Sequence, residues 1–418
     1  MKTRKSMWWN GFEVGWRSRD NKNILLRIGL LMPLVLHYFL WYHRYIENDD
    51  ESCKKENRKG ACKMGQKKSR VEYIDIAKGL SIFFVIMGHA ANNLDEPFYR
   101  VLFYTFHMPL FFMLSGILMK PKENYGLADW KGIIRKNLLV LVVPYFIWGL
   151  LYSQFSYVNF VRIMYGSWKS LTNAGTLTSL WYIPCLFLVR LEVHLLFWLY
   201  KKIKVDSRIL AAITSVISFA IGFLLPYIET PGYVWCFDIS FVALGFVLLG
   251  YAAKDIFKKI SELAWYWLLL GLVISIGFFL IGTVFRREDL DLVLMCGSIY
   301  GDTFWFFWNA FTGSAATLFI AFISVQRNVF HLKESIKYIG RNTFAIYILH
   351  KPILQKLILG FFGLFGFDAF DFWIVAIASL ITLVICCWLT RAIEKYIPQL
   401  LGKFPAPDPK VVDNAEVL

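Results

Sequence analysis

The sequence predicts an all-α membrane protein, a polytopic bundle of ten transmembrane helices with one further apolar helix near the N-terminus. Hydrophobic residues make up 57% of the 418 residues, and the mean hydropathy is +0.50. Charged residues make up 18%, against roughly 25% in soluble domains, so too few remain to cover soluble domains of this total size. The composition therefore excludes a soluble enzyme, a secreted disulfide scaffold and a disordered chain.

Ten apolar segments of roughly 20 residues each are long enough to cross a bilayer. Because backbone polar groups in lipid must be paired within the segment, each is expected to be an α-helix. The segments lie at about 73–94, 99–119, 137–158, 179–200, 209–228, 236–253, 264–284, 303–325, 343–364 and 372–393. They define a membrane domain at 71–395, between an N-terminal extension at 1–70 and a C-terminal tail at 396–418.

The extension contains one apolar stretch at 24–42, which either crosses the membrane or lies along its surface. Arg27, Pro33 and His37 weaken it as a span. A crossing would also place the basic residues before it outside, against the positive-inside rule. We favour an interfacial helix with its aromatic residues at the headgroups.

The net charge is +15, and the Lys and Arg residues that produce it are distributed along the chain in a pattern that sets membrane orientation. Lys and Arg concentrate in alternate loops, at 120–136, 201–208, 254–259 and 327–341, and are sparse or offset by acidic residues in the loops between. Cytoplasmic loops carry the excess of Lys and Arg, so both ends of the ten-helix domain are expected in the cytoplasm, at the plasma membrane of a bacterium. The basic excess therefore indicates a lipid bilayer as partner and no nucleic acid.

Ionisable residues inside the first span are the strongest functional signal, because charges within a membrane are costly. Asp75 and Lys78 are three residues apart and can pair on one helix face. His89 follows Lys78 by eleven residues, which places both on the same face about 16 Å apart, and Asn93 extends the stripe. A snorkelling Lys78 and a histidine that only packs between helices are the alternatives.

Two further histidines are expected within the membrane. His107 lies in the second span at the depth of His89, two residues before Pro109, which is expected to kink the helix. His350 lies in the ninth span and is also followed by a proline. Three histidines at similar depth indicate an acid–base site, although a packing role for His350 is equally open. No carboxylate or thiol stands near them at ligand spacing, so no metal is expected.

The motifs around these residues resemble those of integral-membrane acyltransferase family 3, in particular its fucose 4-O-acetylase-like branch. Lys78 and His89 match the family signature of a basic residue, ten residues and a histidine, and Asp75 stands where the family usually has Asp. Similar blocks follow in order: FHMPLFFMLSG at 106–116, RKNLLVLVVPYFIW at 135–148, LWYIP at 180–184 and YIGRNTFAIYILH at 338–350. The resemblance spans about residues 71–395.

The resemblance implies a membrane O-acetyltransferase that moves an acetyl group from cytoplasmic acetyl-CoA to a sugar hydroxyl of a cell-surface or lipid-linked glycan. It implies that His89 is catalytic and that Lys78 supports it, with a point charge in place of the commoner guanidinium fork. His107 or His350 would orient His89 or protonate the leaving thiolate. The phosphates of acetyl-CoA need cations near the inner boundary, where Lys120, Arg135 and Lys136 lie.

The competing interpretation is a proton-coupled secondary transporter or flippase. Ten spans with intramembrane His, Lys and Asp also suit that class. The sequence contains no P-loop, HExxH or GxSxG motif, so ATP-driven transport, zinc proteolysis and serine hydrolysis lose their usual markers. Consumption of acyl-CoA distinguishes acyl transfer from transport.

Overall fold

The structure, a computed structural model, describes residues 71–90, 98–172, 175–228, 231–289, 292–327, 332–364 and 372–404. Its regular structure within these ranges is helical, apart from one isolated antiparallel bridge between Leu294 and Ile299. The helices belong to a compact unit of Arg70–Ser153 and Tyr157–Leu418. Of the second unit, Met1–Ser69 with Gln154–Ser156, the structure describes only the turn at Gln154–Ser156. The segment 24–42 and Asn93 lie outside the described residues.

The prediction of a polytopic helix bundle is confirmed. In the part of the chain that is described, nine helical stretches are long and apolar enough to cross a membrane, and they correspond to the second to tenth predicted spans. The stretches are built from α3–α4 (Phe98–Tyr104, His107–Ile117), α5–η1–α6 (Leu127–Asn137, Leu138–Val142, Val143–Tyr152), η2–α9 (Gly175–Trp181, Tyr182–Tyr200), α10 (Ser207–Leu224), η3–α11 (Val234–Cys236, Phe237–Ala252), α13–η4 (Trp265–Gly282, Val284–Asp289), α14 (Thr303–Gln326), α16–η7–α17 (Thr343–Pro352, Ile353–Ile358, Leu359–Leu364) and α18 (Phe372–Tyr396). The shorter helices are α7 (Tyr157–Tyr165), α8 (Trp168–Thr172), α12 (Lys254–Ser261), η5 (Met295–Gly297), α15 (Lys333–Arg341) and η8 (Pro398–Leu401).

The first predicted span is α2, Glu72–Gly88, whose 17 residues are fewer than predicted. A helix of this length measures about 25 Å, somewhat less than a hydrocarbon core of roughly 30 Å. The helix stops at His89, whose backbone N–H still bonds to the carbonyls of Val85 and Ile86. His89 is therefore a helix-end residue rather than one inside a continuous span.

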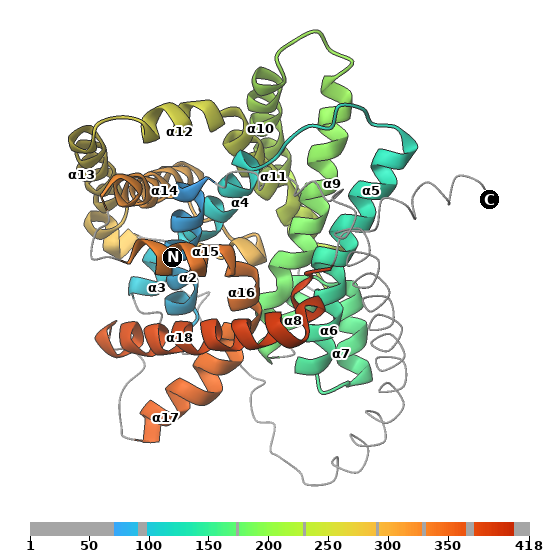
Figure 1. Cartoon of the computed structure of the whole chain (residues 1–418), viewed down its shortest axis with the longest axis vertical. Helices are drawn as coiled ribbons and strands as arrows, with labels where there is room; N and C mark the ends of the chain where they lie inside the picture. The colour runs from blue at the N-terminus through green and yellow to red at the C-terminus, as the bar shows by residue number, and fades with distance from the viewer. Residues whose placement is uncertain are drawn as a thin grey trace, which may run out of the picture. The chain divides into compact units, whose positions relative to one another are not determined.

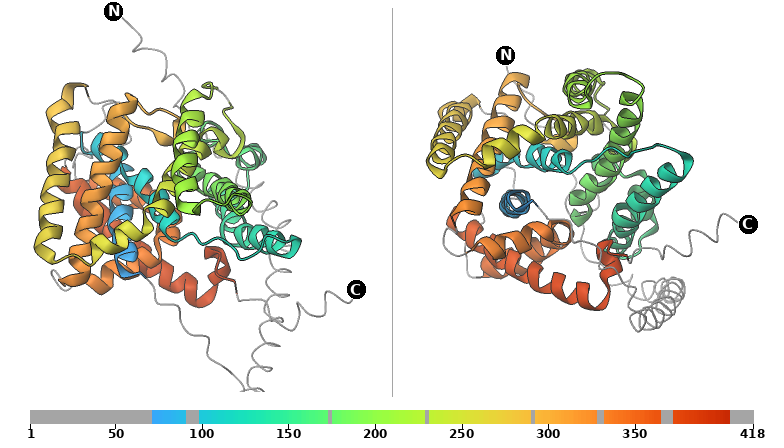
Figure 2. Two further views of the ribbon diagram at one scale, coloured as in Figure 1. Left: turned by 90° about the horizontal axis from the view of Figure 1, so that it is seen from above. Right: turned by 45° about the horizontal axis from the view of Figure 1, so that its top comes forward.

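Helix α2 lies among several other helices, as Figures 1 and 2 show. It contacts α3, α4, α14, α15, α16 and α18. Its closest approach is to α15, where a Cβ atom on Gly340 would stand 1.6 Å from the carbonyl oxygen of Asp75. A Cβ atom on Gly79 would stand 2.5 Å from the carbonyl oxygen of Ile336. Glycine at both positions lets the two backbones touch, as small residues do between membrane helices.

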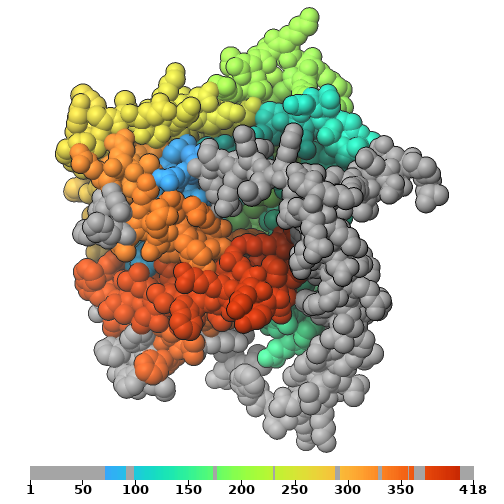
Figure 3. Space-filling view, viewed as in Figure 1, coloured from blue at the N-terminus to red at the C-terminus, as the bar shows by residue number. Residues whose placement is uncertain are grey.

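The helices differ in how much of their surface the bundle covers. In the most apolar part of the span that contains α11, 67% of the residues are buried. In the corresponding parts of the spans of α10 and α13, 28% are buried. Val216 of α10, Val273 of α13 and Trp388 of α18 are more than half exposed. Figure 3 shows α13 and α18 on the surface of the bundle. Apolar side chains exposed to this extent are expected to face lipid, so α10, α13 and α18 form the periphery and α2 and α11 the interior.

The second predicted span is interrupted just before His107. Helix α3 ends at Tyr104 and α4 begins at His107, with Phe106 in a non-helical conformation between them. The chain therefore breaks at Phe106 and not at Pro109, where the kink was predicted. Pro109 lies in the first turn of α4, where a missing N–H costs no hydrogen bond. Across the break His107 stays close to α3, since its Nδ1 lies 2.6 Å from the Phe103 carbonyl oxygen.

The predicted basic loops meet at one end of the bundle. Polar contacts join these loops to one another and to the ends of the helices beside them. They are the ion pair Arg208–Asp255, the hydrogen bond from Lys201 to the Glu123 carbonyl and the 2.7 Å hydrogen bond from Gln326 to the Leu263 carbonyl. The charge alternation in the sequence thus corresponds to a real clustering of the loops in space.

Candidate active site

The candidate active site is centred on His89, which lies between α3 and α16. The rings of His89 and His350 have centroids 5.2 Å apart. On its other side, the Tyr104 hydroxyl is 3.4 Å from Nδ1 of His89. The side-chain amide of Gln355 donates to the His89 carbonyl at 3.2 Å and so ties the end of α2 to η7. Residues of α3, α16 and η7 thus hold the end of α2 and the His89 side chain in place.

His350 is fully buried and has a defined tautomer. Its Nδ1 lies 2.7 Å from the carbonyl oxygen of Tyr347. A carbonyl only accepts, so Nδ1 carries the proton, and Nε2 of the neutral ring has a free lone pair. Among the described residues, His350 Nε2 has no hydrogen-bond partner. A buried, unpartnered ring nitrogen next to His89 can act as a base or a proton acceptor, and buried polar atoms without a partner are few in native proteins.

His107 joins the same group through Tyr104, and it is buried. The Tyr104 and His107 rings meet edge to face with centroids 5.1 Å apart. His107 Nδ1 donates to the Phe103 carbonyl at 2.6 Å, which fixes its tautomer in the way Tyr347 fixes that of His350. The structure therefore brings together all three predicted histidines, with Tyr104 between His89 and His107.

Two cations that the sequence interpretation missed lie beside these histidines. Lys351 is 8% exposed, and both Lys351 and Arg100 are within electrostatic range of His89. The Arg100 guanidinium also lies 5.1 Å from the centre of the Tyr104 ring. Cations so close to a reacting carbonyl would stabilise the negative charge that develops on its oxygen. The rule that intramembrane charges are functional would have identified Lys351, which directly follows His350.

A row of aromatic rings continues from His350 along the bundle. The Tyr347 ring lies 5.9 Å from that of His350, and the Tyr182 ring 5.5 Å from that of Tyr347. Tyr347 is buried, and in the described part of the chain its hydroxyl has no hydrogen-bond partner. Tyr182 belongs to the LWYIP block, so the row connects two of the motifs that the sequence singled out.

Asp75 and Lys78 lie on α2, on the side of His89 toward the basic end. The carboxylate of Asp75 pairs with Arg341 of α15, with Nε and Oδ2 3.1 Å apart. The expected ion pair was with Lys78, and the structure instead gives Asp75 a cation from another helix, because the glycine contact between α2 and α15 brings Arg341 within reach. Lys78 is half-buried on α2. Asp75 is therefore part of the contact that holds α2 in place.

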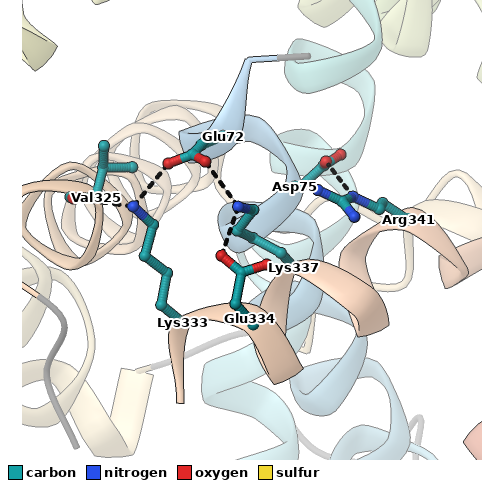
Figure 4. A network of polar contacts seen from close by, with 7 residues as sticks. All are labelled: Glu72, Asp75, Val325, Lys333, Glu334, Lys337 and Arg341. Carbon is teal, nitrogen blue, oxygen red and sulfur yellow. Dashed lines mark hydrogen bonds and ion pairs between the residues drawn. The ribbon is translucent and has the colours of Figure 1, made fainter. Parts of the chain in front are cut away.

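A second polar cluster reinforces this contact one turn away, as Figure 4 shows. Glu72 accepts from both Lys333 and Lys337 at 2.7 Å, and Lys337 also donates to Glu334 at 2.7 Å. The hydrogen bonds from Lys333 and Lys337 lower the pKa of the Glu72 carboxyl. The carboxylates of Glu334 and Glu72 raise the pKa of Lys337. We call Glu72, Asp75, Lys333, Glu334, Lys337 and Arg341 the α2–α15 clasp.

The three cations predicted to bind phosphate, Lys120, Arg135 and Lys136, are exposed and stand apart from the histidines. Arg135 and Lys136 form the last turn of α5, and Lys120 follows α4. They lie near the contacts that join the basic loops. The structure therefore places them at the basic end of the bundle, separated from His89 by most of the length of α2.

These residues lie within a domain that matches a known family. A model of the acyltransferase domain of family 3 matches residues 71–392, which is most of the chain and includes every residue of the histidine group. Among curated proteins, no individual sequence matches the chain.

Proposed function

Because this chain belongs to acyltransferase family 3, we propose that it is a membrane O-acetyltransferase. It would take the acetyl group of cytoplasmic acetyl-CoA and place it on a sugar hydroxyl of a cell-surface or lipid-linked glycan. The observation that carries the site assignment is the pairing of His89 with His350, whose Nε2 is buried without a partner among the described residues. Membership supports the acyl transfer, and the histidine group supports acid–base catalysis as its means.

In the proposed reaction, the acceptor hydroxyl gives its proton to an imidazole nitrogen, with His89 as the base. The hydroxyl oxygen attacks the thioester carbonyl, the new C–O bond forms, and the C–S bond breaks. The thiolate of CoA then takes a proton, for which the imidazolium is the source. Lys351 and Arg100 would stabilise the transient oxyanion, since both act on the His89 position electrostatically.

A covalent route through the same residues is the alternative. His89 would attack the thioester itself, carry the acetyl group as an acyl-imidazole, and release it to the acceptor in a second step. The two routes differ in whether acetyl-CoA is cleaved before the acceptor is present. A burst of free CoA without acceptor would support the acyl-imidazole, and its absence would support direct transfer.

The direction of the reaction depends on the orientation of the bundle. The basic end, with Lys120, Arg135 and Lys136, would face the cytoplasm and bind the phosphates of acetyl-CoA. The histidine group would lie toward the opposite side, where a glycan acceptor is found. Both ends of the ten-helix domain would then be cytoplasmic, as the loop charges predict.

The experiment that tests this function measures free thiol released from acetyl-CoA by the purified protein in lipid nanodiscs. Radiolabelled acetyl-CoA and candidate glycans would be supplied together, and label in the glycan would be counted. Acyl transfer predicts equal amounts of released CoA and transferred acetyl. A transporter or flippase, the competing class, would consume no acetyl-CoA, so the absence of thiol release with every acceptor would contradict the proposal.

A further inference from the structure

Arg190 of α9 is a cation within the membrane-spanning part of the chain, and the mechanism above does not use it. Ten residues of helix separate it from the end of α9 at Tyr200, which corresponds to about 15 Å. This is deeper than an arginine side chain can reach by snorkelling. The residue as a whole is partly exposed, but its guanidinium lies deep among the helices.

The guanidinium of Arg190 is held by a neutral group. Its Nη1 donates to the Asn137 Oδ1 at 3.1 Å, and Asn137 in turn donates to the Ile133 carbonyl at 2.9 Å. Asn137 is buried at the junction of α5 with the π-helix η1, and π-helical turns inside α-helices are frequent at functional sites. Within the described ranges, no carboxylate forms an ion pair with Arg190.

The surroundings of Arg190 add positive charge. Arg190, Lys122 and Lys136 all act electrostatically on His194, one turn further along α9. His194 is itself held by the hydroxyl of Tyr125 at 3.3 Å. An arginine stays charged in a protein, and a largely buried charge with an amide as partner and cations as neighbours is costly unless an anion compensates it. These surroundings favour an anion beside Arg190.

The row of aromatic rings connects this site to the histidines. Arg190 acts electrostatically on Tyr182, eight residues earlier on α9 and about 12 Å along its axis. From Tyr182 the rings of Tyr347 and His350 lead to His89. Two of the buried polar atoms that have no hydrogen-bond partner in the described chain, Tyr347 Oη and His350 Nε2, lie along this row.

We propose that Arg190, positioned by Asn137, binds a phosphate group of the acyl-CoA donor and directs the thioester arm along Tyr182 and Tyr347 toward His89. The inference rests on the proposed function and adds a residue that neither the loop charges nor the family motifs identify. The arm between the phosphates and the thioester of coenzyme A is equivalent to an extended peptide of about five residues, or roughly 17 Å, which suits a phosphate held well inside the bundle. The exposed Lys122 and Lys136 would receive the donor first.

The test measures binding of coenzyme A and of pantetheine, which lacks the nucleotide phosphates, to the purified protein by titration calorimetry. Arg190→Gln removes the charge but keeps an amide, and we expect it to weaken coenzyme A binding about tenfold to a hundredfold with no change for pantetheine. Arg190→Lys keeps the charge without the planar fork, and an intermediate loss is expected. Arg327→Gln, an exposed arginine at the same end of the bundle, is the matched control and should bind as the wild type does.

The outcomes separate this inference from the function on which it rests. If the wild type binds coenzyme A and both Arg190 variants bind it equally well, the Arg190 site is refuted and the acyltransferase assignment stands. If the wild type binds no coenzyme A, the donor assignment fails and the Arg190 site fails with it. A third set of titrations compares nanodiscs of phosphatidylcholine and phosphatidylglycerol. If Arg190→Gln changes only the stabilisation by phosphatidylglycerol, the phosphate belongs to a lipid headgroup, and the proposal is overturned. Should Arg190→Gln not fold, Arg190→Lys alone decides, with unchanged coenzyme A affinity as the refuting result.

Discussion

The ring of His350 lies 5.2 Å from that of His89, although the two residues belong to the ninth and the first predicted spans. The hydrogen bond from His350 Nδ1 to the Tyr347 carbonyl leaves the opposite nitrogen as an acceptor. One imidazole therefore has a fixed tautomer, while the other, at the end of α2, is positioned by Tyr104. We therefore propose that His350 belongs to one proton-transfer unit with His89.

Replacing His350 should reduce turnover far more than it reduces stability. His350→Ala removes the free ring nitrogen next to His89, and we expect kcat to fall by about a hundredfold or more, the usual contribution of a general acid or base. Steady-state release of CoA thiol measures the change. The melting temperature of the variant serves as control, and a kcat within threefold of wild type with an unchanged melting temperature would return His350 to a packing role.

The glycine contact between α2 and α15 should be intolerant of a single methyl group. In Gly340→Ala the new Cβ would stand 1.6 Å from the Asp75 carbonyl oxygen, so the helices must separate. We expect the free energy of unfolding to fall by about 1–3 kcal/mol, as for other overpacked cores, together with a loss of activity because α2 carries His89. Thermal unfolding in nanodiscs measures it.

Gly277→Ala provides the matched control for this substitution. A Cβ at Gly277 of α13 meets nothing within 4 Å, and the residue is also helical and in a span. Alanine there should leave the melting temperature unchanged or raise it slightly. Equal effects of the two alanines would show that the close approach of α2 and α15 does not exist in the folded protein.

The α2–α15 clasp should make stability depend on pH in the acid range. The pKa of Glu72 is lowered from 4.5 by its hydrogen bonds to Lys333 and Lys337. A carboxylate with a lowered pKa in the folded state stabilises the protein above the unfolded pKa, and this stabilisation is lost as the pH falls through the folded value. Glu72 is partly exposed, so the contribution is expected to be roughly 0.5–1 kcal/mol.

The variant Glu72→Gln isolates this contribution. Its melting temperature should be below that of the wild type at pH 7, and the difference should disappear as the pH falls below 4.5. A difference that stayed constant down to pH 3 would mean that the charge of Glu72 does not contribute to the contact.

The charge pattern of the loops predicts which positions an impermeant thiol reagent reaches. With native cysteines removed, a cysteine at Thr230, in a loop poor in Lys and Arg, should react on intact cells. A cysteine at Lys204, in the loop between α9 and α10, should react only after permeabilisation. The reverse pattern would place the basic end outside, away from acetyl-CoA, and the proposed direction of transfer would be wrong.

The sequence predicted the positions and order of the nine candidate spans that the described residues contain, because apolar length is a strong and local signal. It also predicted that His89, His107 and His350 share a site, since intramembrane polar residues are costly and rarely accidental. It did not predict the break before His107 or the early end of α2. Both depend on tertiary packing and on the backbone conformation of a few residues. A continuous apolar segment in the sequence does not indicate either.

The ion-pair partners of the charged residues were harder to predict from the sequence than the positions of those residues. Asp75 was expected to pair with Lys78 because the two are neighbours on one helix, whereas the structure pairs Asp75 with Arg341 from another helix. Lys351 and Arg190 lie inside apolar segments, so the rule that charges within a membrane are functional applies to both residues. The contacts of Tyr104 and Tyr347 with the histidines could not be predicted from the sequence, because an aromatic residue in a membrane span is ordinarily a packing residue.

The central claim is that His89 performs acyl transfer from acetyl-CoA, and one measurement tests it most directly. Wild type and His89→Ala, each in nanodiscs and each shown to be folded by its melting temperature, are given radiolabelled acetyl-CoA and membrane glycans from the producing cell. The account predicts labelled glycan and stoichiometric CoA release with the wild type, and less than about 1% of that rate with His89→Ala. Acetylation by His89→Ala at a rate close to that of the wild type would contradict it.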